Sequence, residues 1–364
     1  MDGIVNYVPK PSPKQSKIVA ELHRRIVSGR YAPGDRLPAL AAIRREFDVS
    51  EVTAQRAVWH LRKEGFLHVR PRQRTRVAKN PPHLCDFGFI LPSGSKQNFF
   101  LALEAEAEKL FSRPSADGFT RRSVICHDFY SAEGYEEIKD LEKRVQSQAL
   151  AGLIFTIPPC MFDASPSLLT EPGIPRVTVS GPAINGVSRV QLGDILPKSL
   201  DYLAERGRQK IGFICSSHLP PEKVREHIHS QVSARGQTTA DHWIQAVNLD
   251  SPKWASHVAR VLLELDDPKR PDALVIMDDN LVPAATEGIA AASFSVPDDL
   301  DVVAHTNFPY PTRSAVAVKR VGSDVRRLLK VSVGLIERWR RGEEVPVTTS
   351  LEALFDHELE ASET

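Results

Sequence analysis

Apolar side chains recur at every third or fourth position in three segments near the start of the chain. In the first segment the stripe consists of Ile18, Leu22 and Ile26. This spacing gathers apolar side chains on one face of a helix, so it predicts three amphipathic helices. They span residues 16–28, 39–47 and 50–64.

The residues between these segments favour helix ends and tight turns. Gly29 follows the first helix, and Pro38 is suited to the first turn of the second. Ser50 can cap the third helix, because its hydroxyl can accept a hydrogen bond from a backbone N–H near Thr53. Short alternations of apolar and polar residues then predict a two-stranded ribbon. Its strands are expected at residues 66–69 and 75–78.

Beyond residue 85 the pattern changes to short apolar runs that alternate with longer amphipathic stretches. Regular alternation of this kind is typical of an α/β fold, in which helices cover both faces of a parallel sheet. About 280 residues are more than one such sheet usually takes, so we expect two lobes. The predicted strands are 87–91, 123–127, 152–157, 176–179, 210–215, 243–247, 273–277 and 301–305, and the predicted helices are 100–111, 135–148, 196–206, 254–265 and 324–341.

The stretch Lys79–His83 contains two adjacent prolines, which stiffen the chain and stop either neighbouring structure from running through it. We therefore expect three parts. These are an N-terminal domain at residues 1–78, a linker at 79–85 and a larger domain at 86–358.

Charge is distributed unevenly between the two predicted domains. The whole chain has a formal net charge of +1, but residues 1–80 hold 17 Lys and Arg against 7 Asp and Glu. The remainder holds 30 basic and 39 acidic residues. A basic domain on an acidic body is expected when that domain binds a polyanion such as DNA, and a solvated charged surface is the alternative.

Composition argues against several other classes of protein. No apolar run approaches the roughly 20 residues that cross a bilayer, and the polar N-terminus is unlike a signal peptide. The four cysteines, Cys85, Cys126, Cys160 and Cys215, are widely scattered and form no Cys-x-x-Cys pair. We therefore expect reduced thiols in a cytoplasmic protein that holds no metal or cofactor.

Motifs of common enzyme active sites are also missing from the sequence. It has no phosphate-binding Gly-Lys-Ser/Thr loop, no Gly-x-Ser-x-Gly turn and no Gly-x-Gly-x-x-Gly. His227 and His229 lack a third ligand at supporting spacing, so a solvated loop is a better interpretation than a metal site.

The N-terminal motifs resemble the GntR family of bacterial transcription regulators. The run Ile26-x-x-Gly-x-Tyr-x-Pro-Gly-x-x-Leu-Pro38 is followed by Phe47-x-Val-Ser-x-x-Thr53 and Ala57-x-x-x-Leu-x-x-Glu-Gly65. The resemblance implies a winged helix-turn-helix, whose third helix enters the major groove of DNA while the ribbon contacts the backbone or minor groove. Expected DNA contacts are Arg36, Ser50, Glu51, Thr53, Gln55, Arg56, Arg70, Arg72, Arg74 and Arg76.

The N-terminal domain departs from the family pattern at the residues that would contact bases. Glu51 and Gln55 stand where the family usually has arginine. A glutamate can accept from the amino group of cytosine and a glutamine can pair with adenine, so we expect a different operator. The wing tip Pro71–Thr75 lacks the family's two glycines, so we expect its backbone geometry to differ. It gains arginines, so we expect it to keep its affinity for DNA.

The larger domain resembles the effector-binding domain of the LacI/GalR regulators. The segments that carry the resemblance are Val190-x-x-x-Asp194, Leu203-x-x-x-Gly207-Arg-x-x-Ile211-Gly-Phe-Ile214, Arg270-Pro-Asp-Ala-Leu274 leading into Asp278-Asp279, and Val296-Pro-Asp-Asp-Leu-Asp-Val-Val303. The resemblance implies a two-lobed periplasmic-binding-protein fold with an effector, often a sugar, between the lobes. It also implies that this domain forms a homodimer.

Four residues are expected to contact the effector: Arg225, Asp278, His305 and Asn307. Arg225 matches the arginine of the family's Arg-x-x-Gly-Phe segment, although the Gly-Phe is absent here. Asp278 stands where the family usually has the asparagine of an Asn-Asp pair. The family's Gly-Phe-Asp-Asp loop appears as Ala304–Asn307, so both carboxylates that commonly bind sugar hydroxyls are replaced.

These observations predict a DNA-binding transcription regulator, by family resemblance a repressor, whose operator affinity is modulated by a small-molecule effector such as a sugar. A homodimer would bind a pseudo-palindromic operator in double-stranded DNA. One alternative is a constitutive regulator whose sensor has lost its ligand and serves only for dimerisation. Another is an enzyme joined to a DNA-binding head, for which the body is short and shows no nucleophile–base pair.

Overall fold

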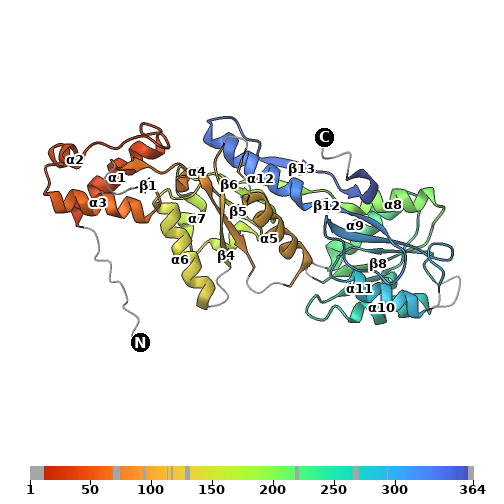
Figure 1. Cartoon of the computed structure of the whole chain (residues 1–364). Coiled ribbons are helices and arrows are strands. Elements are labelled where there is room, and N and C mark those ends of the chain that lie inside the picture. The colour runs from red at the N-terminus through yellow and green to blue at the C-terminus, as the bar shows by residue number, and fades with distance from the viewer. Residues whose placement is uncertain are drawn as a thin grey trace.

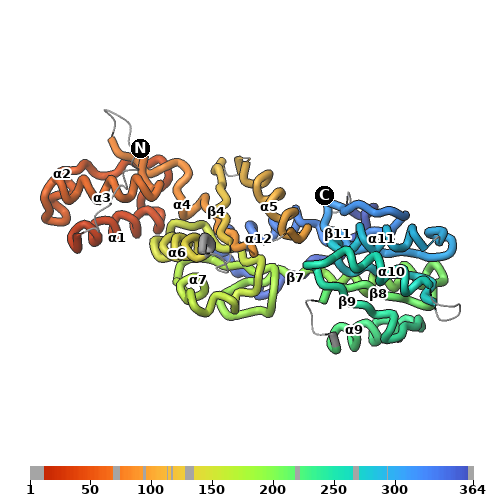
Figure 2. Tube along the Cα trace, turned by 90° about the horizontal axis from the view of Figure 1, so that it is seen from below, coloured from red at the N-terminus to blue at the C-terminus, as the bar shows by residue number. Residues whose placement is uncertain are grey.

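The computed structural model describes residues 12–68, 74–92, 96–112, 114–115, 118–127, 132–217, 221–264, 270–292 and 294–359. It has three bodies in a row: a helical head, a first α/β lobe and a second α/β lobe (Figure 1). The same order is visible from below (Figure 2). The α/β class and the two lobes predicted from the sequence are therefore confirmed.

The head consists of three helices and a small antiparallel ribbon: α1 Pro13–Val27, α2 Leu40–Phe47, α3 Glu51–Lys63, β1 Leu67–His68 and β2 Arg76–Val77. Ile18, Leu22 and Ile26 are buried, as the helical spacing predicts. Gly29 follows α1 with a φ of +76°, which glycine adopts without strain. The position of Pro38 differs from the prediction, because α2 begins only at Leu40. Leu37 lies outside the helix, and its N–H donates to the Thr75 carbonyl, 2.9 Å away.

The predicted linker is not extended throughout, because Pro82–Cys85 form a helical turn, α4. Pro82 lies in the first turn of this helix, where its missing N–H is not needed. The turn leads directly into the first strand of lobe 1.

Lobe 1 is built on a six-stranded sheet whose order is β13-β7-β6-β5-β3-β4 and whose strands are all parallel. The strands are β3 Asp86–Leu91, β4 Arg122–His127, β5 Gly152–Phe155, β6 Arg176–Thr178, β7 Ser188–Leu192 and β13 Thr348–Leu351. Its helices are α5 Asn98–Phe111, α6 Ala132–Gln146, α7 Pro166–Thr170 and α12 Val325–Arg340, with a 3-10 turn at Pro159–Phe162.

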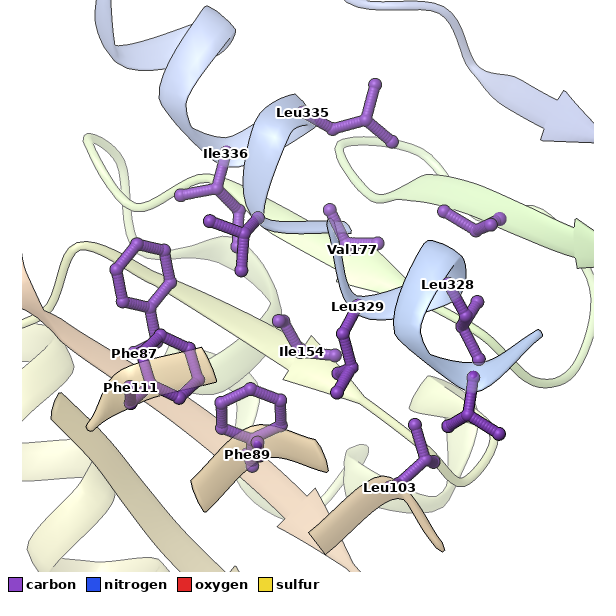
Figure 3. Packing of buried hydrophobic residues seen from close by; sticks show 14 of the residues in the cluster. Phe87, Phe89, Leu103, Phe111, Ile154, Val177, Leu328, Leu329, Leu335 and Ile336 are labelled. Carbon is purple, nitrogen blue, oxygen red and sulfur yellow. The ribbon is translucent and has the colours of Figure 1, made fainter. Parts of the chain in front are cut away.

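Helices α5 and α12 cover one face of this sheet, and α6 and α7 cover the other. Figure 3 shows how Leu328, Leu329 and Ile336 of α12 pack over Ile154 and Phe87 of the sheet. These side chains are all but completely buried. The apolar stripe along α12 therefore fixes this helix to lobe 1.

Lobe 2 repeats the same plan, with the order β14-β12-β11-β10-β8-β9 and only β14 antiparallel. The strands are β8 Ile211–Ser216, β9 Ile244–Val247, β10 Ala273–Ile276, β11 Asp301–Phe308, β12 Lys319–Asp324 and β14 Leu354–Phe355. The helices are α8 Ile195–Glu205, α9 Pro221–Ser233, α10 Trp254–Leu263 and α11 Val282–Ala291, with 3-10 turns at Asp241–Trp243 and Asp356–Glu358. Helices α10 and α11 cover one face, and α8 and α9 cover the other.

The chain crosses between the lobes three times: from β7 to α8, from β12 to α12 and from β13 to β14. Two of these crossings touch at Gly193, where an added Cβ would lie 2.5 Å from the backbone nitrogen of Ala353. Only a glycine allows this approach. In open α/β sheets ligands bind at the carboxyl ends of the strands, which here face the space between the lobes.

Candidate nucleic-acid interface and interlobe cleft

Helix α3 presents most of the predicted base-reading residues. Ser50 caps the helix and accepts from the Thr53 N–H at 3.3 Å, as predicted, while the two hydroxyls lie 2.9 Å apart. Gln55 and Arg56 are exposed on the next turn. Long polar side chains on the first turns of such a helix can reach base edges and phosphates.

Glu51 is held by an arginine of the preceding helix that the sequence reading did not single out. The Arg44 guanidinium lies 3.1 Å from the Glu51 carboxylate, and both side chains are exposed. An exposed ion pair of this kind contributes little to stability. It does set the direction in which the carboxylate points.

Two further exposed side chains on α3 are apolar, and they also lie outside the predicted set. Val52 is 55% exposed in the first turn, and Trp59 is 43% exposed two turns later. The Lys63 ammonium lies over the Trp59 ring, 4.4 Å from its centroid. The predicted DNA contacts are residues that can hydrogen-bond to bases or phosphates, a criterion that does not select Val52 or Trp59.

The wing arginines differ in their surroundings. Arg74 is exposed, whereas Arg76 donates to the Gly34 carbonyl at 2.8 Å and pairs with Arg36 through a β-bridge. Arg36 itself is exposed. The predicted contacts Arg70 and Arg72 lie outside the described residues.

The head rests on lobe 1 through a small buried joint. The Phe66 ring contacts two histidine rings. The His23 ring meets it edge-on, with the centroids 4.4 Å apart, and the His83 ring stacks on it, with the centroids 5.6 Å apart. Burial lowers the pKa of His23 to about 4 and that of His83 to about 3, so both are neutral at pH 7. Gly65 also lies close, because an added Cβ would be 3.3 Å from Pro82.

Lobe 1 contributes its own residues to this joint. Ala149 belongs to the same apolar cluster as the core of the head. The next two carbonyls, of Leu150 and Ala151, accept from the half-buried guanidinium of Arg340 at the end of α12. The joint therefore connects the head with two elements of lobe 1, namely α12 and the start of β5.

A cavity of about 1070 Å³ opens between the lobes. Lys96 and Asn98 line it from lobe 1, and Asp250, Asn280 and Arg313 line it from lobe 2. The remaining lining residues are Pro92, Gln97, Leu249, Pro252, Pro283, Tyr310, Pro311 and Thr312. Its volume is slightly above the range of about 300–1000 Å³ that is usual for small-molecule sites. Charges of both signs beside amides and a tyrosine suit a polar ligand.

Direct hydrogen bonds join the lobes at this cavity. The Asn98 backbone N–H donates to the Asn280 side chain at 2.9 Å. The Tyr310 hydroxyl donates to Glu106 of α5 at 2.6 Å, and Lys109 lies 2.9 Å from the same carboxylate. The Asn98–Asn280 and Tyr310–Glu106 bonds form only when the lobes are close together, whereas the Lys109–Glu106 pair lies within α5.

Three of the predicted effector residues lie at the carboxyl ends of lobe 2 strands, but none of them lines the cavity described above. Asp278 accepts from the Asn280 backbone and side chain at 3.0 and 2.8 Å. Asn307 is buried and donates to Asp279 at 2.8 Å. Burial lowers the pKa of His305 and raises that of Asp279 to about 6, against the effect of the Asn307 hydrogen bond. Their contact with an effector remains a prediction.

Arg225 is exposed on α9. The two histidines considered for a metal site bind carboxylates instead, since His227 lies 2.8 Å from Asp194 and His229 lies 2.7 Å from Asp241. In the described part of the chain, no group of three or more His, Cys, Asp or Glu side chains could hold a metal ion. Among the described helices, each is too short or too polar to span a bilayer.

Two family models match separate parts of the chain. Residues 14–77 match the bacterial regulatory proteins of the gntR family, and residues 200–351 match the periplasmic binding protein-like domain. The first match contains α1 to α3 and the wing, and the second contains most of lobe 2 together with α12 and β13. Both resemblances predicted from the sequence are confirmed.

Individual proteins agree with these matches. The arabinose metabolism transcriptional repressor of Geobacillus stearothermophilus is 24% identical over 332 residues, which are 86% of this chain and 87% of that protein. A LacI family transcription regulator from Clostridium acetobutylicum has a TM-score of 0.60 at 16% identity, covering 74% of this chain and 98% of its own. A LacI family transcriptional regulator from Lactobacillus casei with bound glucose has a TM-score of 0.55 at 19% identity, covering 74% and 97%. The two structural likenesses establish the two-lobed fold.

Proposed function

We propose that this chain, a DNA-binding transcription regulator with a gntR-type head and a periplasmic binding protein-like body, is a repressor controlled by a small polar effector. The effector, such as a sugar, binds between the lobes and changes the affinity of the head for its operator. The observation that carries the proposal is the cavity of about 1070 Å³ whose walls come from both lobes. A ligand held by both lobes can bind one relative position of the lobes more tightly than another, and that difference in affinity is what shifts the equilibrium between them.

The similar proteins support this choice of effector class. One of them is named as a repressor of arabinose metabolism, and another holds glucose in its structure. The lining also supports it, because Lys96, Asp250, Asn280 and Arg313 supply donors and acceptors for a hydroxyl-rich ligand. We retain Arg225, which is already exposed, and Asp278, His305 and Asn307 as candidate contacts.

The proposed DNA contacts come from α3 and its cap, from the wing and from the segment that bridges to the wing: Arg36, Ser50, Glu51, Thr53, Gln55, Arg56, Arg70, Arg72, Arg74 and Arg76. The proposal includes a cytoplasmic homodimer that places two heads on a pseudo-palindromic operator. It also assigns residues 1–78 to the DNA-binding domain, 79–85 to the linker and 86–358 to the effector domain. The chain is proposed to regulate rather than to catalyse, as its relatives do.

A thermal-shift screen of the full chain with pentoses, hexoses, disaccharides and sugar phosphates tests the effector. A ligand at about 100 times its Kd stabilises the folded state by about 2.7 kcal/mol, which raises Tm measurably. The Kd of a hit is then measured for the N280A and R313A variants. We expect both to bind the hit more weakly, while R260A, on the exposed side of α10, binds it normally.

A hit must also change DNA affinity. Fluorescence anisotropy with an operator selected from random duplexes should give a Kd that rises in its presence by about 5- to 150-fold, the usual range of allosteric coupling. If no compound raises Tm, the constitutive alternative is favoured. Sedimentation of the full chain tests the dimer separately.

A further inference from the structure

Val52 is exposed at a place where the neighbouring polar groups already have partners. The Ser50 and Thr53 hydroxyls are bound to each other at the cap, and the Glu51 carboxylate is paired with Arg44. Val52 lies between them in the first turn of α3, and 55% of its surface is in contact with solvent. The first turn is the part of such a helix that comes closest to the base edges.

Docking in the major groove would remove this side chain from water. Every base pair presents polar edge atoms there, and the only apolar feature is the 5-methyl group of thymine. Two apolar groups brought together gain free energy, about 0.8 kcal/mol for each buried methylene-sized unit. A polar base atom covered by a valine instead loses its water without a new partner, which is unfavourable.

We propose that Val52 reads the methyl group of one thymine in each operator half-site. The inference rests on the proposed DNA-binding function, and it adds a specificity-determining residue to it. Val52 both favours thymine and disfavours the other three bases at that position. No hydrogen bond is needed for either effect.

The side chain of Val52 is conformationally restricted, which suits a contact with a single methyl group. A β-branched side chain in a helix is almost confined to one χ1 rotamer, so the two methyl groups of Val52 have a fixed position. Gln55 lies three residues further on and therefore beside Val52 on the same helix face. If Gln55 pairs with an adenine, that adenine should lie within two base pairs of the thymine.

Deoxyuridine in place of thymidine provides the test, because it removes the methyl group and changes no hydrogen bond. An operator is first selected from random duplexes with the full chain, and each thymidine is then replaced singly. We expect one position per half-site at which the Kd rises about fourfold, as the loss of one methyl contact implies. With both half-sites replaced, the rise should be roughly fifteenfold.

The V52A variant completes a double-mutant cycle. It should bind the thymidine operator more weakly by a similar factor and should be insensitive to deoxyuridine at the same position. V261A is the matched control, since Val261 is 62% exposed on α10 of lobe 2. It should keep the full response to deoxyuridine. Both substitutions are at exposed sites, and an unchanged Tm verifies that the variants are folded.

Two results would overturn the proposal. One is a wild-type chain that binds its selected duplex tightly but is indifferent to every single deoxyuridine. The other is a V52A variant that keeps the methyl dependence. Neither result would touch the proposed effector response, which is measured independently. A failure to select any duplex would instead contradict DNA binding itself.

Discussion

At the wing of the head, Arg74 and Arg76 carry the same charge in different surroundings. Arg74 is exposed, whereas Arg76 is committed in part to the Gly34 carbonyl. Each arginine that neutralises a DNA phosphate steepens the salt dependence of binding by about one unit of log K per log salt. Because the proposed homodimer carries this arginine on both heads, we expect R74A to reduce the slope by about two, measured by anisotropy titrations between 50 and 200 mM salt.

The control for this prediction is R260A, which removes an exposed arginine of lobe 2 and should leave the slope unchanged. R76A should lower Tm as well as affinity, because the ribbon loses its bond to Gly34. A slope that is the same for R74A and wild type would mean that Arg74 contacts no phosphate.

Asp279 gives a prediction about pH. Burial raises the pKa of its carboxyl group to about 6 from the ordinary 3.8, although Asn307 donates to it. Between about pH 4 and pH 6 the carboxyl group of Asp279 is therefore protonated in the folded state but ionised in the unfolded state. The resulting stabilisation is present below pH 4 and is lost as the pH rises through 6. D279N should accordingly be more stable than wild type at pH 7.5 but not at pH 4.5, by chemical denaturation at both values.

A D279N variant that is destabilised equally at both pH values would refute this interpretation of Asp279. N307D at the hydrogen-bonding partner offers the converse test. It places two carboxyl groups together in a buried site and should destabilise the fold most at high pH.

The positions of the candidate site residues could be predicted from the sequence only in part. Ser50 at the cap follows from its type and position, and so does the exposure of Gln55 and Arg56. The Arg44–Glu51 pair depends on how α2 and α3 are oriented, which no local pattern encodes. The same is true of the cavity, whose walls come from segments about 200 residues apart.

At the scale of elements, strands with long apolar runs were predictable, whereas polar strands and the two-residue strand β14 were not. All eight predicted strands are present with small shifts at their ends. The pattern missed β7, β12, β13 and β14. Strand β12 reads Lys-Arg-Val-Gly-Ser-Asp, yet its last four residues are buried because it lies between β11 and β14. Its polar groups are buried by neighbours distant in sequence, so hydrophobic patterning could not reveal it.

Helix α11 was missed for the opposite reason. Its sequence is almost uniformly apolar, and five of its ten residues are buried, with α10 packed alongside. A helix without a polar face has no amphipathic period to detect. Helix α9 has the expected period, but it begins at Pro221 directly after another proline in the sequence, and two adjacent prolines do not predict a helix start.

The crossings between the lobes allow a prediction at this scale. Gly193 has no room for a Cβ, which would lie 2.5 Å from the Ala353 nitrogen and 2.7 Å from the Leu351 carbonyl oxygen. Backbone atoms cannot move aside as a flexible side chain can. We expect G193A to push two crossing segments apart, to lower Tm and to weaken effector binding.

Gly334 is the matched control for that substitution. It lies within α12, and no atom is within 4 Å of where its Cβ would be. G334A should be neutral or stabilise the chain by up to about 1 kcal/mol, because alanine is the better helix former. If G193A behaved like G334A in thermal denaturation, the close approach at the crossing would be unimportant.

At the scale of the whole molecule, the joint of His23, Phe66, His83 and Ala149 connects the cavity to the head. Strand β3 runs from this joint to Pro92, which lines the cavity. Helix α12 runs from the crossing at Asp324 to Arg340, which binds the carbonyls beside Ala149. Rigid elements thus lead from the lobes to the base of the wing, since β1 follows Phe66 directly.

The joint should weaken in acid. Since burial lowers the pKa of His23 to about 4 and of His83 to about 3, the unfolded chain takes up protons first as the pH falls below 6.5. Stability is full above pH 6.5 and declines below it, by up to about 1.4 kcal/mol per pH unit for each histidine. The H83L variant removes one of these groups. Its Tm should fall less than that of wild type between pH 7 and pH 5.

Substitutions at His83 also test whether the joint transmits the effector signal. H83A leaves a cavity against Phe66, so the head should lose its fixed position on lobe 1, whereas H83L fills the space with an apolar side chain. The operator Kd is measured with and without the effector. For H83A we expect the ratio of the two values to approach one, with effector binding to the body unchanged, while H83L keeps the wild-type ratio. A full response in H83A would show that the head is coupled to the sensor by another route, such as the arrangement of two subunits on the operator.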